Sequence, residues 1–233
     1  MLISGLQKVT LLDFPGRVAC TVFTGGCNFR CPFCQNASLV LPEELAAYPG
    51  GEDAVLRFLE QRRGLLDGVA ITGGEPLLHA ELPVFLGRVR AMGYQIKVDT
   101  NGTFPERLKA LVGDGLVDMV AMDVKNAPEL YAKTAGLREL DFSAIERSRD
   151  YLLSGVVPYE FRTTVVRGLH TEESLLETAR WISGAEAYFL QGFRSEGDLL
   201  SGAGLGAFTP EEMRAFAEAV RPIVPAVQLR GVD

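Results

Sequence analysis

Short apolar runs rich in β-branched residues recur along the chain, and each is followed by a stretch in which apolar residues return every three or four positions. The short runs predict strands that are buried on both faces. Near-continuous runs such as "VDMVAMDV" are typical of parallel sheets that helices cover. The predicted strands cover residues 17–24, 68–72, 94–99, 117–124, 159–166, 187–191 and 226–229.

The stretches between these strands have the apolar period of amphipathic helices. Two of the predicted helices carry a proline in the first turn, Pro105 and Pro210, and Thr209 is placed to cap the second of them. The predicted helices cover residues 52–63, 80–92, 105–112, 141–153, 172–182 and 210–223.

This alternation of strands and helices predicts an α/β fold with a parallel sheet. Six strand–helix units are about three-quarters of a closed eight-unit barrel, so we expect a partial (βα)6 barrel of the TIM type. Residues 1–233 contain no linker and are predicted to form a single domain, with a core over about 10–191 and a C-terminal helix and strand within 209–230. The longest irregular stretches are 27–51, 126–140 and 192–208. The last of them is rich in glycine and is a candidate mobile loop.

With 233 residues, 47% of them hydrophobic, the chain can bury a substantial core. Its net charge of −7 argues against a nucleic-acid partner, because binding to phosphates requires an excess of basic residues. No apolar run approaches the roughly 18 residues of a membrane span, and Lys8 and Asp13 interrupt any signal-peptide-like segment. We therefore expect a cytoplasmic protein with no membrane partner, whose thiols stay reduced.

Three of the four cysteines lie within eight positions, in the stretch "GGCNFRCPFCQN". Cys27, Cys31 and Cys34 have a C-x3-C-x2-C spacing, which allows one loop to place three thiolates around a single inorganic cluster. In a four-iron cluster, three protein ligands leave one iron without a protein ligand. Catalytic zinc sites likewise keep one coordination position open for water or substrate. Gly25 and Gly26 allow a sharp turn where the preceding strand ends.

Other interpretations of the cysteines stay open on spacing alone. Three free thiols, or a zinc site completed by a distant histidine, are the alternatives. Neither His79 nor His170 lies in a zinc-binding motif, and both are expected at the surface or at a helix end. Cys20 lies inside a predicted strand, seven residues before Cys27, and is expected to be a small core residue and not a fourth ligand.

The segment "CNFRCPFC" is similar to the signature of the radical S-adenosylmethionine (SAM) superfamily, with Phe33 in its aromatic position. The wider stretch "TLLDFPGRVACTVFTGGCNFRCPFCQN" resembles the activases of glycyl radical enzymes, above all the activating proteins of anaerobic ribonucleoside-triphosphate reductase. This resemblance implies a [4Fe–4S] cluster on the three cysteines and SAM on the open iron. It further implies reductive cleavage of SAM to a 5′-deoxyadenosyl radical, which removes hydrogen from a glycine of the partner enzyme. Ferredoxin or flavodoxin would supply the electron.

A second motif, "TGGEP", follows the second predicted strand. It resembles the GGEP motif of the family, which contacts the amino group of SAM. Gly73 and Gly74 permit a close approach of the backbone, and Glu75 offers an acceptor for an ammonium group. The motif alone could be an ordinary turn, but it lies one strand–helix unit after the cysteines, where the family has it.

Charged residues follow the next two predicted strands, in "DTNG" and "MDVK". Active residues of α/β barrels gather at such carboxyl ends. The resemblance implies that Asp99, Thr100, Asp123 and Lys125 contact SAM. It also implies that Asp99, Thr100 and Asp123 could enclose a monovalent cation near the SAM carboxylate, and that Lys125 could pair with that carboxylate. The alternatives are a capped turn and a surface ion pair.

Three further residues match ligand-binding positions of the family. Arg162, on the fifth predicted strand, stands where the family has an arginine that contacts the ligand, although a structural ion pair would also explain it. Asn36 matches an asparagine just after the last cysteine. Gln191 stands where several activases have a histidine that meets the ribose or adenine of SAM. This is a departure, because glutamine can donate and accept hydrogen bonds but cannot become charged.

The chain is a minimal version of such an enzyme, because four cysteines leave no ligands for additional clusters. A minimal barrel has an open side, which suits a macromolecular substrate. One rival interpretation is a radical SAM enzyme that acts on a small molecule, of the deazapurine- or cofactor-forming type. Another is an iron–sulfur or zinc module without catalysis, which would not need the GGEP and charged residues at successive strand ends.

Overall fold

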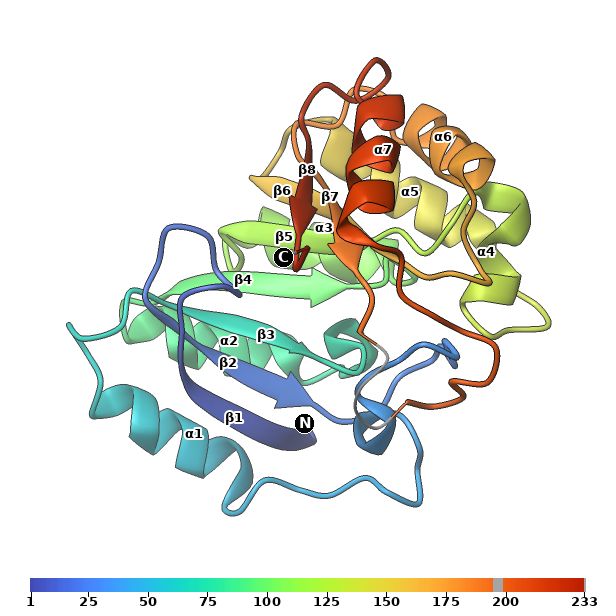
Figure 1. Ribbon diagram of the computed structural model, residues 1–233. Coiled ribbons are helices and arrows are strands. Elements are labelled where there is room, and N and C mark those ends of the chain that lie inside the picture. Colours follow the sequence, from blue (N-terminus) through green and yellow to red (C-terminus); the bar gives the residue numbers. More distant parts are fainter. Residues whose placement is uncertain (195–198, 233) are drawn as a thin grey trace.

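The computed structural model describes residues 1–194 and 199–232. Within this described part, eight strands form one sheet whose spatial order follows the sequence, as Figure 1 shows. β1 pairs antiparallel with β2, and every later strand pairs parallel with the strand before it. The strands are β1 (Ile3–Thr10), β2 (Ala19–Thr24), β3 (Gly68–Gly73), β4 (Gln95–Thr100), β5 (Met119–Asp123), β6 (Tyr159–Val165), β7 (Tyr188–Gly192) and β8 (Val227–Arg230).

The helices that connect the strands lie around the outside of the sheet, from α1 at the bottom of Figure 1 to α6 and α7 at the top. Neighbouring helices pack against one another, as α3 does against α5 and α6 against α7. The helices are α1 (Gly51–Glu60), α2 (Leu82–Ala91), α3 (Pro105–Gly113), α4 (Pro128–Thr134), α5 (Phe142–Leu153), α6 (Glu172–Trp181) and α7 (Pro210–Val220), with short 3-10 turns at η1 (Ala37–Leu39) and η2 (Pro76–Leu78).

The sheet is not closed by hydrogen bonds, because β1 and β8 are its two edges among the described strands. The structure therefore confirms the predicted partial α/β barrel in a single domain. All carboxyl ends of the parallel strands β2 to β8 lie at the same end of the barrel, which is where α/β barrels place their active residues.

The sequence pattern misses two elements. Strand β1 escapes it because Gln7, Lys8 and Val9 are exposed at the sheet edge and interrupt the apolar pattern. The stretch 126–140, predicted to be irregular, contains the short helix α4, which begins at a proline and buries Tyr131. The other elements begin and end within three residues of their predicted bounds.

Several local predictions are confirmed. Thr209 caps α7, where its hydroxyl accepts a hydrogen bond from the Glu212 backbone, and the Glu212 side chain accepts one from the Thr209 backbone. Pro105 and Pro210 lie in the first turns of α3 and α7. Cys20 is fully buried in β2, as a core residue would be. A separate finding concerns membranes: in the described ranges, no helix has the length and apolar character that a crossing requires.

The two faces of the sheet differ in chemistry because side chains alternate along each strand. Apolar residues such as Val98 and Val120 are fully buried among the core residues. The opposite, inner face carries buried charged residues, including Lys97, Asp99 and Glu160. A charged interior is costly unless its members pair with one another, so this inner face is the place to look for a site.

Candidate functional site

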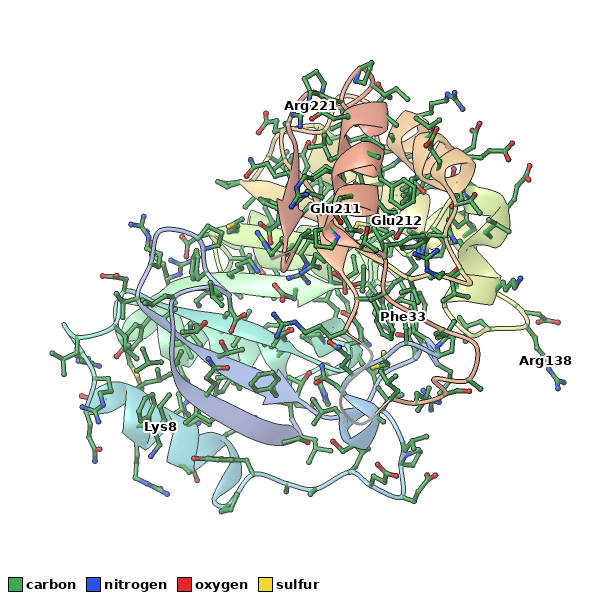
Figure 2. The ribbon with its side chains drawn as sticks, in the orientation of Figure 1. Lys8, Phe33, Arg138, Glu211, Glu212 and Arg221 are labelled. Carbon is green, nitrogen blue, oxygen red and sulfur yellow. The ribbon has the colours of Figure 1, made fainter. Side chains whose placement is uncertain are left out.

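A cavity of about 260 Å³ opens at the carboxyl ends of the strands. Figure 2 shows the Phe33 side chain at this end, beyond the arrowheads of β3 and β4. All fourteen residues that the sequence predicted for the site line this one cavity, although they come from six separate segments. They are Cys27, Cys31, Phe33, Cys34, Asn36, Gly73, Gly74, Glu75, Asp99, Thr100, Asp123, Lys125, Arg162 and Gln191.

The three cysteine thiols face the cavity from the loop after β2. Cys31 is buried and Cys27 and Cys34 are half-buried. Burial raises the pKa of Cys27 to about 12 and that of Cys31 to about 11. Thiols in this setting stay protonated at neutral pH unless a bound metal stabilises the thiolate.

The described residues contain no group of three His, Cys, Asp or Glu side chains that converge on a point suitable for one metal ion. In a [4Fe–4S] cluster each thiolate binds a different iron, so three ligands of a cluster need not converge on a single point. The donor chemistry of Cys27, Cys31 and Cys34 therefore fits a cluster, since thiolates are the ligands that such clusters use.

Hydrogen bonds within the chain set the shape of the cysteine loop. The Arg30 side chain donates from Nη1 to the carbonyl oxygens of Cys27 and Phe29, each at 2.7 Å. The Arg30 backbone donates to the carbonyl of Ala135 at 2.9 Å, just after α4. The Cys34 backbone donates to the carbonyl of Cys31 at 3.0 Å. These contacts hold the loop around its thiols, and the Cys27 thiol itself accepts a hydrogen bond from the Phe29 amide at 3.4 Å.

The GGEP segment docks backbone to backbone against the start of this loop. The Gly74 and Glu75 amides donate to the carbonyls of Thr24 and Gly26, both at 2.8 Å. A Cβ on Gly74 would lie 1.9 Å from the Gly26 carbonyl oxygen. Gly73 has a φ of +115°, and a Cβ there would lie 2.4 Å from the Thr24 backbone. Both glycines are therefore required for the two segments to meet.

Glu75 is buried, with 1% of its surface exposed, and its carboxylate accepts three hydrogen bonds. Oε1 accepts from the Leu77 amide at 3.0 Å and from the Thr100 hydroxyl at 2.8 Å, and Oε2 accepts from the Asn101 amide at 2.6 Å. Burial raises the pKa of Glu75 to about 7, against the lowering effect of these donors. A carboxylate has about four acceptor positions, so one remains for a cationic ligand in the cavity.

Opposite Glu75, five charged side chains form a continuous chain of ion pairs. Arg162 lies between the two aspartates, with Nη1 3.0 Å from Asp99 Oδ2 and Nη2 2.8 Å from Asp123 Oδ1. Lys97 Nζ lies 2.5 Å from Asp99 Oδ1, and Lys125 Nζ lies 3.0 Å from Asp123 Oδ2. The neighbouring cations hold the pKa of both aspartates below the usual range, although burial opposes this.

The ion-pair chain continues to the last strand. Glu160, on β6, is buried and lies 3.8 Å from Lys97 Nζ. Arg230, on β8, binds both Glu160 oxygens at 3.1 and 3.0 Å, and its guanidinium carbon lies 3.8 Å from the centre of the Phe189 ring. Sequence reasoning missed Lys97, Glu160 and Arg230. A signal for two of them was present in the sequence, because side chains alternate between the two faces of a strand. Lys97 and Glu160 each stand two residues before a predicted site residue and so lie on the same face of the sheet.

A second group that sequence reasoning missed joins the cysteine loop to the end of β4. Asn28, between the first two cysteines, donates to the Thr103 hydroxyl at 2.9 Å. Its side-chain oxygen accepts from the Asn101 amide group at 2.8 Å. The Asn101 oxygen in turn accepts from the Thr103 backbone and hydroxyl. Asn101 also lines the cavity.

The remaining predicted residues occupy the rim of the cavity. Phe33 is buried, with Lys125 Nζ 6.0 Å from the centre of its ring. Gln191 is the second-last residue of β7 and is half-buried in the cavity lining. Asn36 is exposed and precedes the turn η1, where its carbonyl accepts from the Leu39 amide at 2.9 Å. Its side chain makes no capping hydrogen bond there.

The stretch 192–208, predicted as a mobile loop, includes residues 195–198, which lie outside the described residues. The described parts on either side contact the cysteine loop. The amides of Leu200 and Ser201 donate to the carbonyls of Cys34 and Pro32 at 3.2 and 2.9 Å. Gln35 Nε2 donates to the Arg194 carbonyl at 2.8 Å. Arg194, Leu200 and Ser201 thus lie against one side of the cysteine loop.

The two histidines lie outside the cavity lining. His79 is half-buried after η2, with Nε2 3.0 Å from the Gly25 carbonyl oxygen. His170 directly precedes the cap of α6, which confirms the helix end as one of its two predicted locations, and it is buried, with 3% of its surface exposed. It accepts from the Val166 amide at Nδ1 and contacts the Lys125 carbonyl through Nε2 at 2.9 Å, so its ring braces the segment that carries Lys125.

Among related proteins, one from Methanocaldococcus jannaschii, provisionally assigned as a glycyl-radical enzyme activating enzyme, is 30% identical over 197 residues. These residues cover 82% of this chain and 80% of that protein. The 7-carboxy-7-deazaguanine synthase of Halobacterium salinarum is 40% identical over 82 residues, which cover only 35% of this chain and 31% of that protein.

Among solved structures, Streptococcus suis SuiB bound to S-adenosylmethionine aligns with a TM-score of 0.68 over 88% of this chain and 48% of that one. Its sequence identity is 14%, so this likeness shows a common fold. Residues 21–182 match the family model of the radical SAM superfamily, and they make up more than half of the chain. On this match, and with its cysteines and GGEP segment at one cavity, the chain belongs to the radical SAM superfamily.

Proposed function

We propose that this protein is an oxidoreductase that activates a glycyl radical enzyme by removing a hydrogen atom from a backbone glycine of its partner. The partner proposed is anaerobic ribonucleoside-triphosphate reductase. The observation that carries the proposal is the gathering of the cysteines, the GGEP segment and the charged strand ends around one cavity. The similarity over 82% of the chain to a protein provisionally assigned as an activase supports the choice of reaction.

Membership of the superfamily implies a [4Fe–4S] cluster and SAM. Cys27, Cys31 and Cys34 would hold the cluster, for which their thiols provide suitable donors. When bound, the cluster and SAM supply one chemistry, the reductive cleavage of SAM to methionine and a 5′-deoxyadenosyl radical. A reduced ferredoxin or flavodoxin is proposed as the electron source.

The residues of the cavity would orient SAM by its charged groups. Glu75, with one acceptor position left, faces the place proposed for the SAM ammonium. Lys125 and Arg162 would bind the SAM carboxylate, because both keep donors beyond those already used in their ion pairs. Phe33, Asn36 and Gln191 remain proposed contacts of the rest of the molecule, on the strength of their place in the lining.

The chain supplies position and shielding rather than a base or a nucleophile, because the cofactors carry the chemistry. The edge strands β1 and β8 do not pair with each other in the described part of the chain, so hydrogen bonds do not close the barrel on this side. We propose that the glycine segment of the partner enters there. A macromolecular substrate can itself exclude water from such a site on binding.

A second candidate function is a radical SAM reaction on a small molecule. The 40% identity to a 7-carboxy-7-deazaguanine synthase favours it, although that match covers about a third of each chain. The two candidates differ in what must be added for a productive reaction. An activase needs a protein partner, whereas a small-molecule enzyme needs a metabolite.

The test is anaerobic reconstitution of the cluster, followed by reduction, addition of SAM and assay of 5′-deoxyadenosine with and without candidate glycyl radical proteins. We expect 5′-deoxyadenosine together with a glycyl-type doublet in the electron paramagnetic resonance spectrum of the partner. Formation of 5′-deoxyadenosine without a radical on any partner would favour the small-molecule candidate. A well-formed, reduced cluster that gives no 5′-deoxyadenosine would contradict both.

A further inference from the structure

Lys97 is a charged residue at the site for which neither the sequence motifs nor the proposed reaction has a use. It lies in the middle of β4 with 1% of its surface exposed. Its ammonium group lies 2.5 Å from Asp99 Oδ1 and 3.8 Å from Glu160 Oε1. A lysine this deeply buried requires negatively charged partners whose attraction offsets the cost of desolvating the ammonium group. One of these partners, Asp99, is a residue of the proposed SAM site.

The resemblance implies a monovalent cation held by Asp99, Thr100 and Asp123, and the donor set of this structure does not fit that cation. Each of the four aspartate oxygens already faces a cationic group. The Asp99 oxygens face Lys97 and Arg162, and the Asp123 oxygens face Arg162 and Lys125. An incoming metal ion would have to share these oxygens with charge-assisted hydrogen bonds, and the neighbouring cationic groups would repel it.

Thr100 is committed in the same way. Its hydroxyl donates to Glu75 Oε1 at 2.8 Å and accepts from the Gly102 amide at 3.1 Å. A hydroxyl oxygen has two acceptor positions, so at most one remains for a cation. No oxygen predicted as a ligand is therefore free of an existing partner.

The charge balance of the inner face points the same way. The chain of ion pairs contains four cationic side chains, Lys97, Lys125, Arg162 and Arg230, against three carboxylates, Asp99, Asp123 and Glu160. The carboxylate of SAM would bring the two counts level. A further monovalent cation would leave an uncompensated positive charge in a buried setting, which is unfavourable. Without the charge of Lys97, by contrast, a cation would restore the balance.

We propose that Lys97, together with Arg162, supplies the positive charge that a monovalent cation would otherwise bring to Asp99 and Asp123, so that SAM binds without any added alkali metal ion. Lys97 is thus a positioning residue, which acts on the ligand through Asp99 and Arg162. This inference rests on the proposed binding of SAM in the cavity.

The first experiment uses the wild-type protein with its cluster reconstituted anaerobically and left oxidised, so that SAM is bound and not cleaved. The dissociation constant for SAM is measured in tetramethylammonium, sodium and potassium chloride at equal ionic strength. We expect the three values to agree within about twofold. Binding that is about tenfold or more tighter in sodium or potassium than in tetramethylammonium would overturn the proposal. Failure to bind SAM in any salt would overturn the proposed function, and this inference with it.

The second experiment removes the charge. In Lys97→Met we expect SAM to bind about tenfold more weakly in tetramethylammonium and to recover most of that loss in potassium. Lys97→Arg should bind like the wild type in every salt, because it keeps the charge. Lys8→Met is the matched control, since Lys8 is exposed and lies far from Phe33 in Figure 2. If Lys97→Met binds SAM as the wild type does in all three salts, Lys97 has no such role.

A spectroscopic measurement provides an independent check. The cluster is photoreduced without sodium dithionite, and its electron paramagnetic resonance spectrum is recorded before and after addition of SAM. The change on SAM addition should be the same in tetramethylammonium and potassium for the wild type and for Lys97→Arg. A change that requires potassium in the wild type would contradict the proposal, even if Lys97→Met fails to fold.

Discussion

The two walls of the cavity are built in different ways. The wall formed by the cysteine loop and the GGEP segment depends on backbone contacts, as the bonds from Gly74 to Thr24 and from Glu75 to Gly26 show. The wall formed by β4, β5 and β6 depends on charged side chains that pair across the inner face. The first wall is therefore disrupted when a side-chain atom is added to one of its glycines, and the second is disrupted when one of its charged groups is removed. Each can be tested by a substitution that leaves the other wall intact.

The largest effect is expected from the thiols. Cys27→Ala, Cys31→Ala and Cys34→Ala should each abolish cluster binding and SAM cleavage, because an iron loses its protein ligand. Iron content and the visible absorbance of the reconstituted protein measure this. Cys20→Ala is the control and should keep both, since Cys20 is buried in β2 away from the cavity lining. Loss of the cluster in a folded Cys20→Ala protein would overturn the ligand assignment.

In the wall of charged side chains, the largest loss of stability is expected from removal of the central residue, Arg162. Arg162→Met leaves Asp99 and Asp123 without the cation between them, so the free energy of unfolding should fall by about 3 to 5 kcal/mol. Anaerobic urea unfolding of the reconstituted protein measures the loss. Arg214→Met is the control, because its pair with Glu211 is exposed, and it should change stability by less than about 0.5 kcal/mol. Equal stabilities of the two variants would mean that the inner ion pairs contribute nothing.

Glu75 joins the two walls, and its pKa of about 7 predicts a pH dependence. Because the fold disfavours the ionised carboxylate, this group lowers stability progressively as the pH rises from about 4.5 to about 7 and by a constant amount above that. Glu75→Gln cannot ionise, so the stability of the wild type relative to this variant should fall across that window, by up to about 3 kcal/mol. A difference that stays constant from pH 4.5 to pH 7.5 would contradict the raised pKa.

The smallest of these effects is expected in the backbone wall. Gly74→Ala places a Cβ 1.9 Å from the Gly26 carbonyl oxygen, so the two segments must separate at a cost of about 2 kcal/mol. SAM binding should weaken as well, because the Glu75 carboxylate moves with the segment. Gly87→Ala is the control, since the space around Gly87 in α2 is open, and it should leave SAM binding unchanged. Thermal unfolding and the SAM dissociation constant together distinguish the two variants.

The sequence predicts most of the barrel, because short runs rich in apolar residues alternate with helical periods along the chain. It misses β1, whose exposed residues at the sheet edge hide the apolar pattern, and α4, which is too short to show a period. Motifs or positions that match the family marked the fourteen residues predicted for the site, and all of them line one cavity.

The residues that link these motifs could not be found so easily. Asn28 and Asn101 meet across 73 positions of the chain, and only the fold brings them together. Arg230 reaches Glu160 across 70 positions in the same way. Lys97 could have been found, because side chains two residues apart on a strand lie on the same face, which places Lys97 with Asp99 on the inner face. A charged residue within an apolar strand, two positions from a predicted site residue, is therefore a signal worth using.

The amide-to-carbonyl bonds between the GGEP segment and the cysteine loop have a thermodynamic consequence. The segment that would receive SAM and the loop that would receive the cluster cannot rearrange independently, because they share these bonds and the contacts of Asn101. Two ligands that stabilise one arrangement favour each other reciprocally, by the same factor in both directions. Saturation with SAM should therefore raise the affinity of the protein for its cluster by the same factor by which the intact cluster raises the affinity for SAM.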